Sequence, residues 1–260
     1  MENITLNTIY NEGCLDTMKR MNNNFIDLVI TSPPYDNLRK YKGYTFDFES
    51  IAKELYRVIK IGGIIIWIVG DKIKNGNRSL TSFKQALYFQ EVGFNVHDVM
   101  IYKKKNTPFM RSNAYTNCYE FMFVLSKQKI NTFNRLTEKT VRHGFEGLPF
   151  NKGVDGINKK VVKELKEKKT KINIWEYAVG LGGTTKDREA FKHPAIFPEK
   201  LAEDHILSWS NQNDIIYDPF MGSGTTAKMA LLNNRYYLGS EISKEYCEIA
   251  NKRINKNNVN

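Results

Sequence analysis

Two adjacent prolines, Pro33 and Pro34, stand directly after the apolar run FIDLVI at residues 25–30. Proline has no backbone N–H group, so neither residue can donate a hydrogen bond to a neighbouring strand. The run therefore predicts a buried strand that ends in a stiff turn just after it. The tetrapeptide SPPY places the hydroxyl of Ser32 at the start of this turn and the ring of Tyr35 at its end.

Strand-like and helix-like segments alternate through residues 1–127 and again from about residue 194. Alternation of this kind predicts an α/β fold with an open, mainly parallel sheet. Strands are expected at 4–10, 25–30, 64–70, 94–104, 118–127, 214–220 and 235–242, and helices at 15–21, 48–60, 79–93, 198–210, 224–234 and 243–256. The run IIIWIVG at 64–70 is uniformly apolar, which predicts a central strand covered on both faces. We expect 94–104 and 118–127 to form an antiparallel pair at an edge.

The alternation breaks between about residues 128 and 192, where glycines are scattered and periodicity is weak. This stretch holds fifteen Lys and Arg against eight Asp and Glu, so it carries most of the net charge of +11. A local excess of positive charge is typical of a surface that faces nucleic-acid phosphates. The segment 161–171 reads as a short basic helix, which would either contact phosphates or form a solvated face. Aromatic residues of this stretch, Phe145, Phe150, Trp175 and Tyr177, are expected to make its small core rather than to wedge into a duplex.

The cysteines Cys14, Cys118 and Cys247 lie far apart and show no CxxC spacing. This argues against a disulfide framework and against a zinc site, so we predict reduced thiols, no metal and a cytoplasmic location. The N-terminal stretch MENITLNTIY lacks the pattern of a secretory signal, and no apolar run approaches the length of a membrane span. No membrane association is therefore expected.

A second turn follows from DPFMGSGTT at residues 218–226, between an expected strand and an expected helix. Gly222 and Gly224 allow a tight turn and a close approach of the backbone to a ligand. Asp218 before the turn would repel a pyrophosphate but could hold an ammonium group, and Glu241 after the next strand could accept both hydroxyl hydrogens of a ribose. A sulfonium ligand with an amino-acid ammonium and a ribose fits this set, which indicates S-adenosylmethionine.

The proline turn suits chemistry on an exocyclic amino group of cytosine or adenine. The lone pair of such a group is delocalised into the ring, and acceptors aimed at its hydrogens would relocalise it on nitrogen. The Ser32 hydroxyl and the Pro33 carbonyl would accept one hydrogen each, and Tyr35 could stack on a base swung out of the duplex.

SPPY followed by DPFMGSGTT resembles the amino-group DNA methyltransferases, which methylate cytosine N4 or adenine N6 with S-adenosylmethionine. The catalytic turn precedes the cofactor turn, an order similar to the circularly permuted β class. The segment 193–206, HPAIFPEKLAEDHI, resembles the family segment that wraps the methionine moiety. The resemblance implies a Rossmann-like seven-stranded methyltransferase sheet with 4–10 beside 235–242. It implies a catalytic and cofactor-binding domain over 1–127 and 193–260, and a target-recognition insertion at 128–192.

The resemblance also assigns roles to individual positions. The catalytic residues would be Ser32, Pro33, Pro34 and Tyr35, and the cofactor residues Asp218, Pro219, Phe220, Gly222, Ser223, Gly224, Thr225, Glu241, Cys14 and Pro198. Phe220 would lie against the adenine, and His193 would belong to the wrapping segment. The family often has an aspartate directly before the N-terminal Cys-Leu pair, to accept from the adenine amino group. Gly13 stands there in this chain, so Glu12 or Asp16 would substitute or the contact would be lost.

Serine in the tetrapeptide is more usual in the cytosine-N4 enzymes, so we predict cytosine N4, with adenine N6 as the alternative. Methyltransferases of RNA or of protein glutamine usually carry Asn-Pro-Pro-Tyr after the cofactor turn, so the order here argues against them. A non-catalytic partner is a third hypothesis, against which both intact turns argue. Double-stranded DNA is the expected partner, while a homodimer and a cognate restriction endonuclease both stay open.

Overall fold

The computed structural model describes residues 4–34, 46–107, 112–141, 151–152, 156, 158–159 and 166–256. The chain divides into two compact units. The main unit comprises Met1–Asn134 and Asn173–Asn260, and the small unit comprises Arg135–Ile172. The small unit covers fewer residues than the expected insertion at 128–192, because residues 128–134 and 173–192 belong to the main unit.

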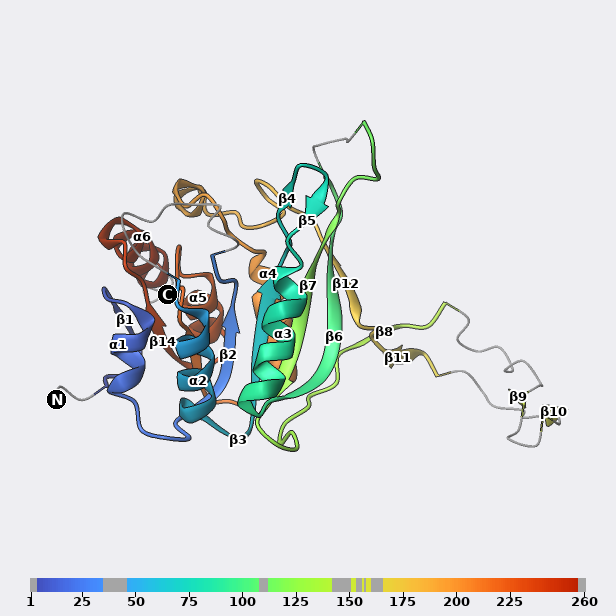
Figure 1. Cartoon of the computed structure of the whole chain (residues 1–260), viewed down its shortest axis with the longest axis horizontal. Coiled ribbons are helices and arrows are strands. Elements are labelled where there is room, and N and C mark those ends of the chain that lie inside the picture. Colours follow the sequence, from blue (N-terminus) through green and yellow to red (C-terminus); the bar gives the residue numbers. More distant parts are fainter. Residues whose placement is uncertain are drawn as a thin grey trace. The chain divides into compact units, whose positions relative to one another are not determined.

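The main unit contains an eight-stranded sheet in the order β1-β14-β13-β2-β3-β7-β6-β12 (Figure 1). Its strands are β1 (Thr8–Tyr10), β2 (Ile26–Thr31), β3 (Ile59–Val69), β6 (Asn95–Lys104), β7 (Tyr119–Ser126), β12 (Ile174–Tyr177), β13 (Ile215–Asp218) and β14 (Tyr236–Ser240). Strand β7 runs antiparallel to both neighbours, and the other pairs are parallel. The predicted α/β fold with an open, mainly parallel sheet is confirmed, including the pairing of β1 with β14, although the sheet has eight strands where seven were expected.

Strand β12 is an eighth strand where irregular chain was expected. It pairs with β6 from Ile174 opposite Ile101 to Tyr177 opposite Lys104. The expectation that 94–104 and 118–127 lie at an edge was therefore wrong, although their antiparallel pairing is confirmed. The strand is short, and alternation places its two aromatic residues, Trp175 and Tyr177, in buried positions while their neighbours are exposed.

Six α-helices and one 3₁₀ helix, η1, are described in the main unit. They are α1 (Cys14–Lys19), α2 (Phe48–Val58), α3 (Thr81–Val92), η1 (Arg188–Lys192), α4 (Glu199–Trp209), α5 (Thr225–Leu232) and α6 (Lys244–Asn255). Helices α1, α2 and α3 pack in series, as do α4, α5 and α6, so the sheet lies between two helical layers (Figure 1). Within the described part of the chain, none of the helices is long and apolar enough to cross a membrane.

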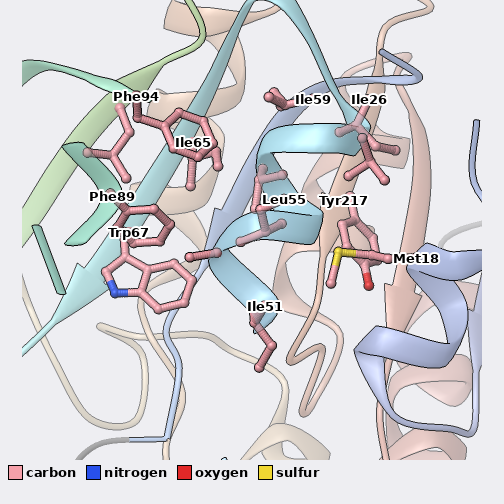
Figure 2. Close-up of a cluster of buried hydrophobic side chains, with 14 of the residues drawn as sticks. Met18, Ile26, Ile51, Leu55, Ile59, Ile65, Trp67, Phe89, Phe94 and Tyr217 are labelled. Carbon is pink, nitrogen blue, oxygen red and sulfur yellow. The ribbon is translucent and has the colours of Figure 1, made fainter. Parts of the chain in front are cut away.

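A cluster of buried apolar side chains lies under α1, α2 and α3 (Figure 2). Strand β3 supplies Ile65, Trp67 and Val69 to this cluster, while its alternate residues, such as Ile66 and Ile68, are equally buried. Burial on both faces is what the uniformly apolar run predicted, and it makes β3 a central strand. Central strands fix the positions of the turns that follow them, including the proline turn after the neighbouring β2.

The small unit consists of short antiparallel pairs. Strand β8 (Thr137–Lys139) pairs with β11 (Lys168–Thr170), and β9 (Asn151–Lys152) pairs with β10 (Asn158–Lys159). The expected helix over 161–171 was therefore wrong for Lys168–Thr170, and residues 161–165 lie outside the described part. Lys168–Thr170 holds no apolar side chain with which a helix could pack. It pairs instead with β8, where Lys169 lies 3.1 Å from Glu138. A two-stranded hairpin, β4 (Ile73–Lys74) with β5 (Asn77–Arg78), belongs to the main unit.

Candidate functional site

The proline turn and the glycine turn leave the same edge of the sheet from neighbouring strands. Strands β2 and β13 are parallel partners, with Leu28 opposite Ile216 and Val29 opposite Tyr217. Ser32 follows the last residue of β2, and Pro219 follows the last residue of β13. Since parallel strands place their carboxyl ends at one edge, the two turns are neighbours in space.

The Asp218 carboxylate links the two turns through hydrogen bonds. Thr31, the last residue of β2, donates from Oγ1 to Asp218 Oδ1 over 2.6 Å. Thr226 in α5 donates from Oγ1 to Asp218 Oδ2 over 2.8 Å, and the backbone N–H of Phe220 donates to Oδ1 over 3.0 Å. Asp218 is 1% exposed. The structure therefore places it beneath the turn as a cross-link, while its role toward an ammonium group stays a prediction.

Burial raises the pKa of the Asp218 carboxyl to about 6, because the charged form is disfavoured away from water. The hydrogen bonds from Thr31, Thr226 and the Phe220 backbone oppose this increase, and the nearby charge of Glu241 adds to it. The carboxyl of Glu241 also has a raised pKa, again mainly because of burial.

We expect Asp218→Asn to change how stability depends on pH. The pKa of this carboxyl is about 6 in the folded chain and close to its ordinary value of 3.8 in the unfolded chain. Between these values the folded chain holds a proton that the unfolded chain has lost, so the carboxyl contributes stability that is complete below the unfolded pKa and is lost as pH rises through about 6. The stability of the wild type relative to the variant should fall by about 3 kcal/mol over this range.

Urea unfolding of both proteins between pH 4 and pH 8 measures this difference. A difference that stays constant across the range would contradict the raised pKa of Asp218.

The glycine turn is crowded on two sides. Gly222 and Gly224 have φ values of +51° and +82°, in the left-handed region that favours glycine. A Cβ atom on Gly224 would lie 2.8 Å from the Cβ of Ala250 in α6, and one on Gly222 would lie 3.0 Å from Nε2 of His193. The backbone of the turn therefore runs between α6 and the segment that contains His193.

Glu241 binds the backbone of the same turn. The N–H of Gly222 donates to its Oε2 over 2.9 Å, and the N–H of Ser243 donates to its Oε1 over 2.8 Å. Glu241 lies beyond the end of β14 and is 8% exposed. Each carboxylate oxygen can accept more than one hydrogen bond, so these contacts leave capacity for ribose hydroxyls. The ribose-binding role itself stays a prediction.

Gly224→Ala should destabilise the fold and weaken binding of S-adenosylmethionine. The left-handed backbone and the clash with Ala250 would together cost about 1–3 kcal/mol, and we expect a rise of about tenfold in Kd as the turn shifts. Thermal unfolding and isothermal titration calorimetry provide the two measurements. Gly76→Ala is the matched control, because Gly76 has a similar φ of +75° but no atom within 4 Å of an added Cβ. Equal losses in both variants would show that crowding at Gly224 plays no part.

The remaining predicted residues lie around these turns. Pro33 is buried, and Ser32 and Pro34 are partly buried, whereas Tyr35 lies outside the described residues. The ring of Phe220 packs 5.6 Å from that of Phe46 and 6.3 Å from that of Trp67, measured between centroids. The glycine turn contains Pro219 and Ser223, and α5 begins at Thr225. The N-cap of α4 is Pro198, and the first residue of α1 is the buried Cys14.

Glu12 and Asp16 occupy different environments. Glu12 lies just beyond Tyr10, the last residue of β1. The backbone N–H of Glu241 donates to the carbonyl of Tyr10 over 3.0 Å, so Glu12 and Glu241 lie at the same edge of the sheet. Glu12 accepts from Thr17 Oγ1 over 2.7 Å and forms an ion pair with Arg20. Asp16 pairs with Lys19 on an exposed face of α1. Of the two, the geometry favours Glu12 for an adenine contact.

Sequence reasoning did not assign the roles of three side chains that organise the site. Thr31 directly precedes SPPY and Thr226 is the last residue of DPFMGSGTT, so their positions carried a signal that went unused. Arg253 in α6 hydrogen-bonds Ser223 and Thr225, and no motif in the sequence points to it. Its partners lie far from it along the chain.

Comparison with known proteins agrees with this geometry. A family model described as DNA methylase matches residues 26–252. The orphan methyltransferase M.BamHII of Bacillus amyloliquefaciens is 55% identical over 235 residues, which cover 88% of each chain. Among solved structures, PvuII DNA methyltransferase (cytosine-N4-specific) aligns with a TM-score of 0.73 and 21% identity over 99% of this chain and 89% of that one. A complex of M1.HpyAVI with S-adenosylmethionine aligns with a TM-score of 0.61 and 23% identity over 95% of this chain and 98% of that one.

Both solved structures support the fold. The family match runs from the start of β2 into α6, as far as residue 252, and so includes both turns and the network around Asp218. By this match, and by its close similarity to M.BamHII, the chain belongs to the DNA methylase family, the amino-group methyltransferases that use S-adenosylmethionine.

Proposed function

We propose that this DNA methyltransferase transfers a methyl group from S-adenosylmethionine to N4 of a cytosine that is turned out of the duplex. The observation that carries the proposal is the hydrogen bond that links the two turns. In it, Thr31 Oγ1 donates to Asp218 Oδ1 over 2.6 Å. This link fixes the end of β2, where Ser32 begins, against the end of β13, where the glycine turn begins. A base at the first turn would then meet a methyl donor at the second.

The residues of the proline turn would supply the acceptors for the reaction. Ser32 Oγ and the Pro33 carbonyl would each accept one hydrogen of the target amino group, which localises the lone pair on nitrogen and stabilises the positive charge that develops. Proline at positions 33 and 34 restricts the backbone and so holds both acceptors in a fixed direction. Tyr35 would stack on the extruded base. When bound, S-adenosylmethionine supplies the electrophilic methyl group.

The residues of the glycine turn would hold the cofactor. Glu241 would accept from the ribose hydroxyls, and the N-terminus of α5 at Thr225 would face the carboxylate of the methionine moiety. Gly222 and Gly224 would allow the backbone to approach the ligand, and Pro198 and His193 would contribute to the wall beside it. Glu12 would accept from the adenine amino group in place of the aspartate that Gly13 replaces.

Two observations favour cytosine N4 over adenine N6. The tetrapeptide begins with Ser32 and not with aspartate, and the aligned PvuII enzyme is named as cytosine-N4-specific. The assignment can be tested directly by incubating unmethylated double-stranded DNA with the enzyme and S-adenosylmethionine. The DNA is then digested to nucleosides, and the products are identified by mass spectrometry. N4-methyldeoxycytidine is the expected product. N6-methyldeoxyadenosine would overturn the choice of base, and absence of transfer from labelled cofactor would favour a non-catalytic partner.

The stretch 128–192 would recognise the target sequence. Its small unit presents exposed positive side chains suited to DNA phosphates, including Arg135, Lys139, Lys166, Lys168 and Lys169. M.BamHII is named an orphan methyltransferase, which supports a role for this chain without a cognate restriction endonuclease. A cytoplasmic location is part of the proposal, and a homodimer stays a prediction that sedimentation would test.

A further inference from the structure

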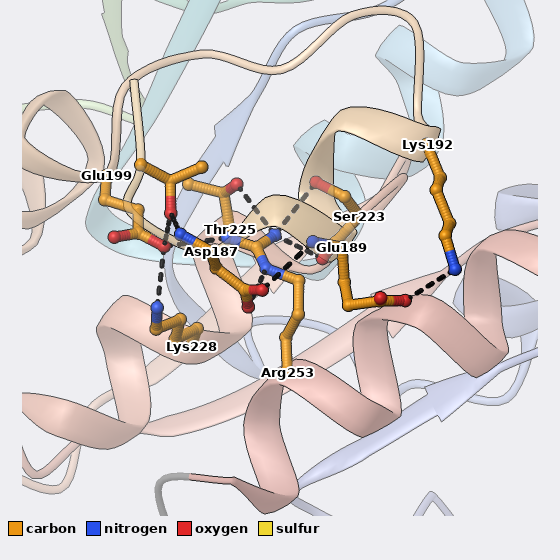
Figure 3. Close-up of polar contacts among 9 residues, drawn as sticks. Asp187, Glu189, Lys192, Glu199, Ser223, Thr225, Lys228 and Arg253 are labelled. Atoms are coloured by element: carbon orange, nitrogen blue, oxygen red, sulfur yellow. Dashed lines mark hydrogen bonds and ion pairs between the residues drawn. The ribbon is translucent and has the colours of Figure 1, made fainter. Parts of the chain in front are cut away.

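Arg253 is a fully buried arginine in α6, and its guanidinium lies among side chains from separate parts of the chain (Figure 3). Toward the glycine turn, its Nη1 donates to the carbonyl and to the hydroxyl of Ser223, the latter over 2.9 Å. The hydroxyl of Thr225 lies 3.4 Å from the same nitrogen. One side of the guanidinium therefore binds the turn that the cofactor is proposed to occupy.

The other side of the guanidinium binds the segment before α4. Arg253 Nε donates to Asp187 Oδ2 over 3.1 Å, and Nη2 donates to Glu199 Oε1 over 2.7 Å (Figure 3). Asp187 caps η1, and Glu199 is the first residue of α4. The two carboxylates thus mark the two ends of a segment that contains His193 and Pro198.

The carboxylate of Glu199 accepts hydrogen bonds from several side chains. Besides Arg253, its Oε1 accepts from Lys228 Nζ over 2.7 Å and from Thr185 Oγ1 over 2.8 Å. Lys228 lies in α5, directly after the glycine turn. The network therefore connects α5, α6 and the segment 185–199, and its charges balance within a largely buried space.

The spacing of these elements determines the space around the glycine turn. His193 lies against Gly222, and Ala250 of α6 lies against Gly224, so the turn is enclosed from both sides. The guanidinium is planar and presents several donors in fixed directions, so it can bind the turn and both carboxylates at once. A lysine ammonium is a compact charge on a flexible stem and cannot reproduce this fixed geometry.

We infer that Arg253 is a positioning residue for the cofactor site, which holds the segment 185–199 at a fixed distance from the glycine turn. The inference rests on the proposed cofactor residues of that turn and of the wall beside it. Arg253 should act on binding of S-adenosylmethionine and not on the methyl-transfer step. The proline turn, which is proposed to carry out that step, is held beside the glycine turn by the hydrogen bond between Thr31 and Asp218 and not by Arg253. Its effect should therefore appear in the affinity for the cofactor.

Arg253→Lys tests this role, with Arg235→Lys as the matched control. Arg235 is also buried, and it binds Ser210 O over 2.7 Å, but it precedes the amino end of β14, at the opposite edge of the sheet. We expect Arg253→Lys to raise Kd and KM for S-adenosylmethionine about tenfold, with kcat at saturating cofactor and KM for DNA within about threefold of wild type. Arg235→Lys should lower the melting temperature while leaving the cofactor Kd within about twofold.

Calorimetric titration with S-adenosylmethionine in the absence of DNA separates the inference from the proposed function. If the wild type binds the cofactor and Arg253→Lys binds it equally well, the positioning role is overturned while the proposed function stands. If both arginine variants weaken binding in proportion to their loss of stability, Arg253 has only a structural role. If the wild type itself fails to bind the cofactor, the proposed function fails.

Discussion

Asp218→Ala is expected to destabilise the protein by about 2–4 kcal/mol and to abolish methyl transfer. Removing the carboxylate leaves the buried hydroxyl of Thr31 and the N–H of Phe220 without this acceptor, while the hydroxyl of Thr226 keeps the carbonyl of Ile30 at 3.3 Å. Each unpaired buried group costs about 1–3 kcal/mol, and relief from burying a carboxyl with a raised pKa offsets part of the sum. The two turns would also lose their link, so activity should fall further than stability alone explains.

Urea unfolding and transfer of labelled methyl groups to DNA measure the two effects. Asp214→Ala is the matched control, because Asp214 directly precedes the opposite end of β13 and accepts from the backbone N–H of Asn211 over 2.7 Å. The control should lose about 1 kcal/mol or less and retain transfer, because its acceptor site is partly exposed and far from the turns. An Asp218→Ala protein that is as stable and active as this control would exclude the cross-link as a determinant of the site.

The central sheet could be predicted from sequence because its strands carry their own signals. The apolar runs of β2 and β3 require burial on both faces, and prolines or glycines end them at defined positions. The parallel direction of the strands follows from their alternation with helices. The proximity of the two turns depends also on β13 lying beside β2, and this order came from the resemblance to the methyltransferase family and not from local patterns.

The outer strand and the basic segment of the small unit were not predictable in the same way. Strand β12 has four residues, Ile174–Tyr177, and its alternation of exposed and buried positions becomes evident only beside β6. Residues Lys168–Thr170 form a strand through pairing with Thr137–Lys139. Both elements depend on partners distant in sequence, and a single sequence gives no information on such pairing.

The hydrogen-bond networks have the same origin. Arg253 is one basic residue among several in an amphipathic helix, and its partner Asp187 lies 66 residues earlier in the chain. Thr31 and Asp218 are 187 residues apart. Sequence motifs identified residues whose chemistry is specific, but residues that act by holding those motifs in place became evident only from the geometry.

Ser32→Ala should reduce kcat for methyl transfer by about 10²–10³-fold while leaving Kd for S-adenosylmethionine unchanged. The reason is that the hydroxyl is proposed to accept a hydrogen from the target amino group, an interaction that strengthens only as positive charge develops in the transition state. The substitution removes one oxygen atom from a turn whose backbone is fixed by Pro33 and Pro34. Single-turnover transfer to DNA and calorimetric titration with the cofactor measure the two quantities.

Ser32→Asp distinguishes loss of an acceptor from loss of shape. A carboxylate can accept from the amino group of either base, so this variant should recover part of the transfer that Ser32→Ala loses, with cofactor affinity again close to wild type. If both variants bind the cofactor normally but are equally inactive, the acceptor role of Ser32 is wrong and the position acts through the shape of its side chain. If Ser32→Ala transfers methyl groups at the wild-type rate, the catalytic chemistry lies elsewhere in the chain.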